Sequence, residues 1–213
     1  MLTINGRKVC ENVSEVVSPE RAALAIIDIE DSTMWSKGED AIILQKVKKL
    51  IESARSINLP VFYFYNRRGP GLNNISPAYV RVLMNCGWDV ERVQKAYPDG
   101  KAAGSLHPEF DPRPNENVIP KDRGSAFEGT NFELLLRSMG RETVILVGCS
   151  SDWCVEATAW YATNKDYYTI VVEDCVRGPR PEGHVAALKQ FRALGLDVLD
   201  SSELLKLWDE CDS

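Results

Sequence analysis

Short runs of consecutive apolar residues alternate with amphipathic segments along most of the chain, and this alternation constrains the fold most strongly. The runs have the pattern of strands that are covered on both faces, and they lie at 22–27, 61–65, 118–120, 144–147, 168–172 and 197–199. Helical patterns follow them, for example at 40–57, 182–194 and 202–209. Strands that alternate with helices form a parallel sheet between helix layers, so the sequence predicts an α/β fold.

The length and composition favour one domain. A chain of 213 residues that is 44% hydrophobic can bury one substantial core, and we expect a single domain over 1–213. Residues 1–20 show weak periodicity and are expected to form an N-terminal arm that lies over the surface. Residues 72–117 contain five prolines that interrupt any long helix, so we expect an irregular lid or specificity region there.

Charge and cysteine usage exclude several classes of protein. The net charge is −6 without a basic stripe, which argues against nucleic acid and against an anionic membrane as partners. No apolar run approaches the ~20 residues that span a bilayer, and the first residues lack the pattern of a secretory signal. Six scattered cysteines in a chain of this size indicate reduced thiols. We therefore expect a cytoplasmic protein without disulfides.

The stretch from Thr143 to Tyr161 places a thiol between a strand and a helix. The apolar run 144–147 stops at Gly148, a polar bend follows, and Cys154 opens a segment rich in alanine. Unpaired N–H groups and the helix dipole at a first helical turn stabilise a thiolate, which makes Cys154 a candidate nucleophile. The alternative is a structural thiol that behaves as a small hydrophobe. Partners elsewhere in the sequence must decide between the two.

Two charged residues follow other apolar runs in the same way. Asp28 follows the run 22–27, and Lys121 follows 118–120. The carboxyl ends of parallel strands share one edge of a sheet, so both side chains can converge with Cys154. A carboxylate can take the thiol proton, an ammonium can balance the charges, and N–H groups at the helix start can receive an oxyanion. The residues thus indicate a cysteine hydrolase with Asp in place of His.

Other candidate binding residues lie near the same edge. Trp35 belongs to an acidic and aromatic loop after the first long strand, and Trp153 precedes Cys154. Arg67 and Arg68 follow the strand 61–65, and they are either a solvated loop pair or ligands of a substrate carboxylate.

Several other sites are disfavoured by the sequence. Trp88 and Tyr97 could also line a pocket, but lone aromatic residues more often serve packing, so both stay outside the predicted site. The two histidines, His107 and His184, form no pattern of a Cys–His pair or a zinc site. Glycine-rich phosphate loops are absent. We predict no metal and no cofactor.

Four motifs in order resemble those of the isochorismatase-like cysteine hydrolases: AIIDIEDS at 25–32, VIPKDRGSAFEGTNFELLL at 118–136, VGCSSDWCVEATAWYA at 147–162 and VVEDCVRG at 171–178. The resemblance implies a three-layer α/β/α fold with a central, mostly parallel six-stranded sheet and a catalytic triad of Asp28, Lys121 and Cys154. It also implies a cis peptide bond between Cys149 and Ser150, and an oxyanion hole formed by the N–H groups of Ser150 and Cys154. A homo-oligomer, either a dimer or a tetramer, is implied as well.

Three departures from the family pattern bear on the activity. Nicotinamidases of the family hold a metal with an Asp and histidines after the second strand, whereas this chain has Asn66, Arg67 and Arg68 there, which argues against nicotinamidase activity. Members that cleave the vinyl ether of isochorismate commonly lack the cysteine, so its presence favours C–N cleavage. Glu30 and Asp31 stand where the family usually carries Gln and Asn. This added charge either raises the pKa of Asp28 or points outward.

These observations predict a hydrolase that acts on a non-peptide C–N bond of a linear amide. Its substrate would be a small amide, ureido or carbamoyl compound, cleaved through a thioester with release of ammonia or an amine. Two alternatives stay open. One is an ether or ester hydrolase of the isochorismatase type in which Cys154 is a bystander. The other is a non-catalytic member that binds a metabolite or a protein.

Overall fold

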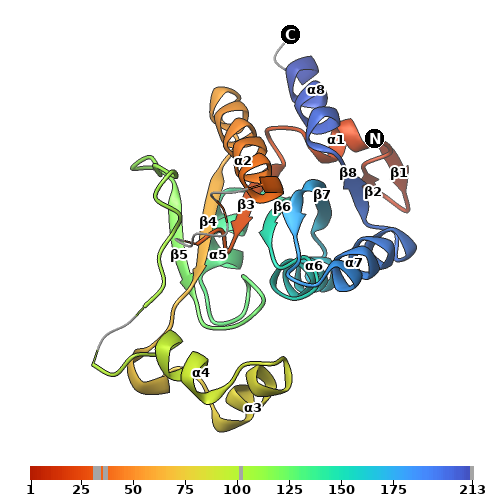
Figure 1. The fold of residues 1–213 in the computed structure, drawn as a ribbon. Helices are drawn as coiled ribbons and strands as arrows, with labels where there is room; N and C mark the ends of the chain where they lie inside the picture. The colour runs from red at the N-terminus through yellow and green to blue at the C-terminus, as the bar shows by residue number, and fades with distance from the viewer. Residues whose placement is uncertain (31–34, 36–37, 101–102, 212–213) are drawn as a thin grey trace.

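The fold is built on a six-stranded sheet in which every pair of neighbouring strands is parallel, in the order β5-β4-β3-β6-β7-β8 (Figure 1). A computed structural model of the protein describes residues 1–30, 35, 38–100 and 103–211. The strands are β3 (Ala22–Ile27), β4 (Val61–Asn66), β5 (Asn117–Lys121), β6 (Thr143–Cys149), β7 (Tyr168–Arg177) and β8 (Asp197–Leu199). The six predicted runs correspond to these six strands.

Helices cover both faces of the sheet. One layer packs on the first face and consists of α1 (Val13–Val16), α2 (Gly38–Ser56) and α8 (Ser201–Cys211). The other layer consists of α5 (Phe132–Ser138), α6 (Cys154–Asn164) and α7 (Pro181–Ala193). The three-layer α/β/α fold with a parallel six-stranded sheet is therefore confirmed. Among the described helices, none combines the length and the apolar character needed to cross a membrane.

The central strand β3 shows why the apolar runs are continuous. All six of its residues are fully buried. Ala22, Leu24 and Ile26 pack in the core beneath α2 and α8, while Ala23, Ala25 and Ile27 pack against α5 and α6. Since successive side chains point to opposite faces, a strand covered on both sides needs apolar residues at every position.

Residues 69–100, which lie between β4 and β5, form a cap. It includes a short 3-10 turn, η2 (Pro70–Leu72), and two helices, α3 (Pro77–Asn85) and α4 (Val90–Ala96). The region predicted to be irregular thus contains two short helices, and its described residues from 97 to 116 form no helix or strand. Pro77 occupies the first turn of α3, where a missing N–H costs nothing, and Ser76 caps that helix by accepting the Tyr79 N–H. Asp89 caps α4 in the same way. In Figure 1 the cap lies apart from the helix layers.

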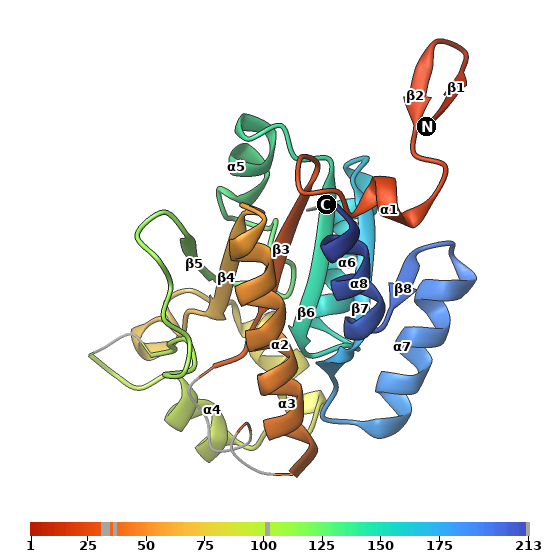
Figure 2. The ribbon, with the colours of Figure 1, turned by 90° about the horizontal axis from the view of Figure 1, so that it is seen from above.

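The first residues form a hairpin of β1 (Leu2–Ile4) and β2 (Arg7–Val9). Figure 2 shows this hairpin projecting from the body. The sequence predicts that residues 1–20 form an arm over the surface. The structure differs, because the hairpin projects from the body and the residues that follow it enter the core. Val16 and Val17 are buried, and the Trp208 indole donates a hydrogen bond to the Val17 carbonyl at 3.0 Å.

Two local boundaries also differ from the predicted ones. The helix α2 begins at Gly38, and Asp40 lies in its first turn, where it pairs with Arg177. Strand β7 continues to Arg177 after a register shift against β6.

Candidate active site

Asp28, Lys121 and Cys154 lie together at the carboxyl ends of three strands of the sheet. Asp28 follows β3, Lys121 ends β5, and Cys154 begins α6 after the loop that follows β6. Strands β3 and β6 approach closely at this edge, where Ile27 pairs with Gly148. Gly148 has φ +115°, and a Cβ there would lie 2.0 Å from the Ile27 carbonyl oxygen. Only glycine lets the strands meet in this way beside Asp28.

A buried ion pair joins Asp28 to Lys121. The Nζ atom of Lys121 lies 2.8 Å from Oδ2 of Asp28, and it donates hydrogen bonds to Oδ1 of Asn66 at 2.8 Å and to the Arg123 carbonyl at 3.0 Å. Lys121 is 1% exposed and Asp28 is 8% exposed. Apart from Lys121 and the neighbouring Cys154 thiol, neither oxygen of Asp28 has a hydrogen-bond partner among the described residues. The carboxylate is therefore placed to accept the thiol proton.

The surroundings raise the pKa of both partners. Burial raises the pKa of Asp28, the Lys121 charge opposes this, and the nearby Glu30 charge adds to it. Burial alone would lower the pKa of Lys121, but the Asp28 charge and the hydrogen bonds to Asp28 and Cys154 outweigh it and raise that pKa. Lys121 is therefore a firmly protonated ammonium. Asp28 is a stronger base than an exposed aspartate.

Cys154 is half-buried at the first position of α6. The preceding loop folds back through the Ser150 carbonyl, which accepts the N–H groups of Trp153 at 3.1 Å and Val155 at 3.0 Å. The peptide bond between Cys149 and Ser150 is cis. Among the described residues, the N–H groups of Ser150 and Cys154 have no backbone acceptor. These two donors remain available at the helix start.

Burial also determines the state of the thiols. It raises the pKa of Cys154 well above its ordinary value, and the Asp28 charge raises it further against the opposing effect of Lys121. The pKa of Cys149, at the end of β6, is raised to about 11, again mainly by burial. Cys154 is thus a neutral thiol at rest, and it needs a base before it can attack.

Glu30 organises the residues behind the ion pair. Its Oε1 accepts the Asn66 backbone N–H at 2.8 Å and the Asn66 side-chain amide at 3.0 Å, while its Oε2 accepts Arg68 at 2.6 Å. Because the Asn66 amide nitrogen faces Glu30, its oxygen faces Lys121. Of the two sequence interpretations, the structure supports the one in which Glu30 lies inside the site and raises the pKa of Asp28. Asp31 lies outside the described residues.

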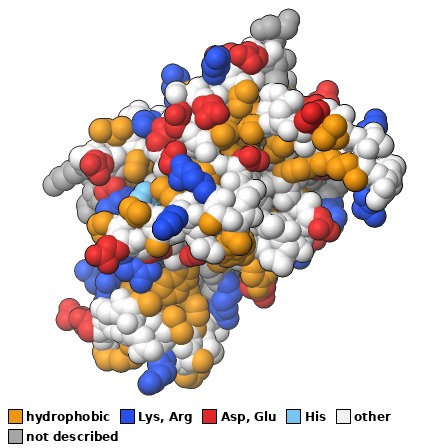
Figure 3. All heavy atoms as spheres, turned by 90° about the vertical axis from the view of Figure 1, so that its right-hand side faces the viewer, with side chains coloured by type: hydrophobic (Ala, Val, Ile, Leu, Met, Phe, Trp, Pro, Cys, Tyr) orange, Lys and Arg blue, Asp and Glu red, His pale blue; other side chains and the backbone are white. Residues whose placement is uncertain are grey.

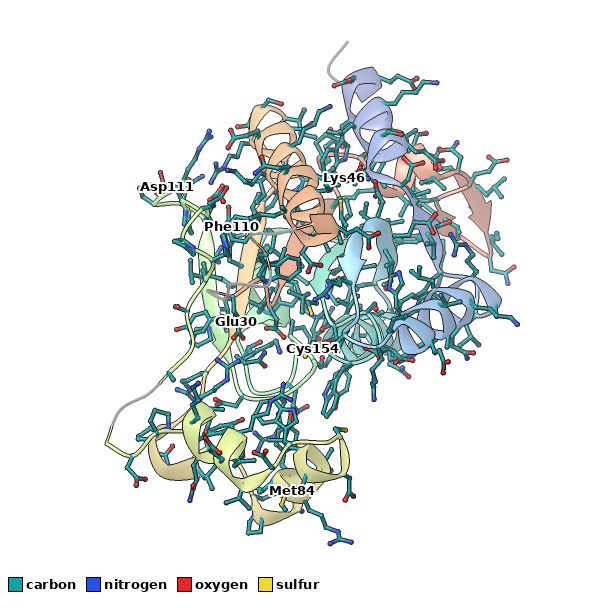
Figure 4. All side chains as sticks on the ribbon, viewed as in Figure 1. Glu30, Lys46, Met84, Phe110, Asp111 and Cys154 are labelled. Carbon is teal, nitrogen blue, oxygen red and sulfur yellow. The ribbon has the colours of Figure 1, made fainter. Side chains whose placement is uncertain are left out.

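A pocket of about 450 Å³ opens above Asp28 and Cys154. The body supplies one wall and the cap supplies the other. In Figure 4, Cys154 and Glu30 lie at the edge of the body that faces the cap, whereas Met84 lies on the cap itself. The wall contributed by the cap consists of Tyr79, Leu83, Cys86, Trp88, Arg92 and Tyr97.

Charged side chains of the pocket are joined in four ion pairs, which we call the pocket ion pairs. They are Lys121–Asp28, Arg68–Glu30, Arg67–Asp122 and Arg180–Asp152. Arg67 and Arg68 both line the pocket, but each already binds a carboxylate of the protein itself. The Arg67–Asp122 pair is largely exposed, whereas Glu30 and Arg68 are more buried.

The structure places the other predicted residues at the pocket in different ways. Trp153 lines it and packs on Gly124, where a Cβ would lie 3.1 Å from the indole ring. Trp35 lines it too, but it is 1% exposed and belongs mainly to the core. Ser150 also lines the pocket.

Sequence reasoning missed most of the cap wall. Trp88 and Tyr97 were left outside the predicted site, and Tyr79 and Arg92 were not considered. Two sequence signals mark the starts of these helices: Ser76 before Pro77 at α3, and Asp89 at the N-terminus of α4. Short helices in this region would have presented a side-chain face to the pocket.

The histidines and the cysteines take no part in a metal site among the described residues, where no group of three or more His, Cys, Asp or Glu side chains is arranged to hold an ion. Nδ1 of His184 lies 2.9 Å from the hydroxyl oxygen of Ser151, within hydrogen-bond distance. His107 is buried against Phe110. The five cysteines whose side chains are described are free.

Several known proteins resemble this chain over most of its length. The ureidoacrylate amidohydrolase RutB of Pantoea ananatis is 25% identical over 186 residues, which cover 78% of this chain and 72% of the relative. N-carbamoylsarcosine amidase from Thermoplasma acidophilum has a TM-score of 0.65 at 28% identity, with 85% of this chain and 96% of that chain covered. A cysteine hydrolase from Pseudomonas syringae pv. phaseolicola shares the fold, with a TM-score of 0.77 at 17% identity and coverage of 92% and 96%.

A family model matches most of the chain. Residues 22–203 match the isochorismatase domain, from the first residue of β3 into α8. This range contains all six strands of the sheet and the residues that line the pocket. The chain therefore belongs to the isochorismatase family.

Proposed function

We propose that the protein is a cysteine-dependent amidohydrolase that cleaves a C–N bond of a small linear amide, ureido or carbamoyl compound. The observation that carries this proposal is the ion pair of Asp28 and Lys121, buried at the floor of the pocket where Cys154 begins α6. Relatives with amidohydrolase activity support the same reaction class. Neither a metal nor a cofactor is needed for the steps below.

In the first half of the reaction, Asp28 takes the proton from the Cys154 thiol. The thiolate attacks the substrate carbonyl carbon, a C–S bond forms, and the carbonyl oxygen becomes an oxyanion that accepts hydrogen bonds from the N–H groups of Ser150 and Cys154. The C–N bond then breaks while protonated Asp28 gives its proton to the leaving nitrogen. Ammonia or an amine departs, and a thioester remains.

In the second half, a water molecule attacks the thioester and loses a proton to Asp28. The C–S bond breaks, the Cys154 thiolate regains the proton from Asp28, and the acid product leaves. Lys121 stays protonated throughout, because it keeps contact with Asp28 and Asn66. Its charge compensates the negative charge that alternates between Asp28 and Cys154. Burial raises the pKa of Asp28, which makes its carboxylate a stronger base toward the Cys154 thiol.

The test is ammonia release from a panel of ureidoacrylate, N-carbamoylsarcosine, maleamate, nicotinamide and acetamide. Wild type is compared with Cys154→Ala, Asp28→Asn and Lys121→Ala. We expect release by wild type only, with kcat lowered at least about a thousandfold in Cys154→Ala, because the covalent path is then lost. Trapping of a thioester on wild type by hydroxylamine would identify the intermediate.

Two results would contradict this proposal. Ammonia release that persists in Cys154→Ala excludes the thioester and favours an ether or ester hydrolase in which the thiol is a bystander. An intact fold that releases no ammonia and does not react with iodoacetamide at Cys154 favours a non-catalytic binding protein. Circular dichroism of each variant separates loss of the reaction from loss of the fold.

A further inference from the structure

The charges of the pocket do not cancel. Each of the four carboxylates in the pocket wall is matched by one cation in the pocket ion pairs. Arg92, on the cap helix α4, also lines the pocket, and among the described residues it has no acidic partner. Four carboxylates and four arginines line the pocket, and Lys121, which lies beneath this lining, pairs with Asp28. Counted with Lys121, the described pocket therefore has one positive charge without an acidic partner. Such a charge favours an anionic ligand.

Arg92 is held in position by two contacts. Its backbone N–H donates to Oδ1 of the helix cap Asp89 at 2.7 Å. Its guanidinium lies over the Trp88 ring, with 4.3 Å between Cζ and the ring centroid. A contact with an aromatic face uses no N–H donor of the guanidinium, and the exposed Arg92 side chain donates no hydrogen bond to another described residue. A guanidinium with free donors can bind a carboxylate through two parallel hydrogen bonds.

The two arginines considered from the sequence are less suited to this task. Arg68 donates to Glu30, and Arg67 donates to Asp122 through two nitrogens. A substrate carboxylate at either position would have to displace a carboxylate of the protein. Arg180 is in the same situation with Asp152. Binding at Arg92 requires no such displacement.

We propose that Arg92 binds a carboxylate of the substrate, so that the enzyme acts on anionic amides or ureido acids whose other end lies at Cys154. This inference rests on the proposed function and adds a specificity residue to it. The cap would then select the substrate while the body carries out the chemistry. Figure 3 shows the cap as a separate lobe, and Arg92 belongs to the pocket wall that the cap supplies.

The experiment compares two carboxylates with their neutral methyl esters: N-carbamoylsarcosine and ureidoacrylate. kcat/KM is measured for wild type, Arg92→Met, Arg92→Lys and Arg81→Met. Arg81 is the matched control, because it is an exposed arginine on cap helix α3 that does not line the pocket. The ammonia product is the readout for both members of each pair.

We expect wild type and Arg81→Met to prefer the acid over its ester by about tenfold or more, which is the value of one charge-assisted hydrogen bond. Arg92→Met removes this preference mainly through a higher KM for the acid, with a smaller change in kcat/KM for the ester. Arg92→Lys restores part of it. A preference that persists in Arg92→Met overturns the proposal, and so does an equal loss for acid and ester, which would indicate a structural role.

Calorimetric binding separates failure of this inference from failure of the proposed function. Cys154→Ala and Cys154→Ala/Arg92→Met are titrated with the same acids and esters. If wild type hydrolyses none of them, the proposed reaction fails for these compounds. Tighter binding of the acid by Cys154→Ala, lost in the double variant, still supports Arg92. Equal binding of acid and ester, or no binding of either, overturns it.

Discussion

Glu30 connects the surface of the pocket to its catalytic floor through two hydrogen-bonded residues. It fixes the orientation of the Asn66 amide, and Asn66 in turn accepts a hydrogen bond from Lys121. It also contributes a negative charge that raises the pKa of Asp28. The other charged groups that face Asp28 are Lys121, which lowers its pKa, and the Cys154 thiol beside it. Glu30 is therefore a positioning residue in the proposed mechanism.

Glu30→Gln should move the acid limb of the pH profile of kcat/KM to lower pH. Asp28 must be ionised to accept the thiol proton, so activity rises with pH through the pKa of Asp28, which lies above 3.8. Removing the Glu30 charge lowers that pKa, and the limb shifts downward by up to about one pH unit, the usual effect of a nearby charge. Rate profiles between pH 4 and 9 measure this shift.

Glu20→Gln serves as the control, because Glu20 is exposed and does not line the pocket. Its profile should coincide with that of wild type. If Glu30→Gln lowers the rate equally at every pH, Glu30 supports only the shape of the site, and its electrostatic role is refuted.

Single residues differ in how far the sequence could predict them. Asp28 and Lys121 were identifiable because each follows an apolar run, and the ends of parallel strands meet at one edge. The partners of Arg67 and Arg68 were not, since Asp122 and Glu30 lie 55 and 38 positions away. A charge in a loop carries no local signal of which distant carboxylate it will meet. Arg92 is distinguished from Arg67 and Arg68 by these pairings, because it has no acidic partner among the described residues.

At the scale of elements, the junction between β3 and β6 determines where Asp28 and Cys154, the proposed base and nucleophile, lie. Gly148 pairs with Ile27, directly before Asp28, and its own strand ends in the loop that leads to Cys154. The close contact between the two backbones therefore positions the base and the thiol together.

Gly148→Ala should destabilise the protein by about 3 kcal/mol or more, because it combines an unfavourable positive φ with a Cβ placed against the Ile27 backbone. Gly140→Ala is the matched control. Gly140 also has a positive φ, +65°, but a Cβ there meets no atom within 4 Å. It should cost only about 1–2 kcal/mol, from the backbone alone. Urea unfolding measures both, and equal losses would refute the close contact as the cause.

The elements themselves show why strands were predicted better than the cap. Strands buried on both faces need uninterrupted apolar residues, so β3 and β6 were evident in the sequence. The cap helices α3 and α4 are only nine and seven residues long, and each has one buried residue, Leu83 or Val93. Their starts are encoded by caps and by Pro77, which was interpreted as an interruption.

At the scale of the whole molecule, the assembly state stays a prediction. We expect a dimer or a tetramer, since most soluble oligomers are closed and symmetric. The cap leaves Val82, Met84 and Val90 between 43% and 59% exposed, and Figure 3 shows hydrophobic side chains on this lobe. Analytical ultracentrifugation should give a mass of two or four times 23.8 kDa. A mass of one chain at micromolar concentration would contradict the expectation.

The cap is tied to the body at its base by a two-way contact, in which Arg68 and Ala103 exchange backbone hydrogen bonds of 2.8 Å. The two ends of this insertion are thus held side by side whatever lies between them. Such a closed base tolerates changes of length and sequence in the enclosed segment. The segment between Arg68 and Ala103 can therefore change without displacing the strand ends at which Asp28 and Lys121 lie.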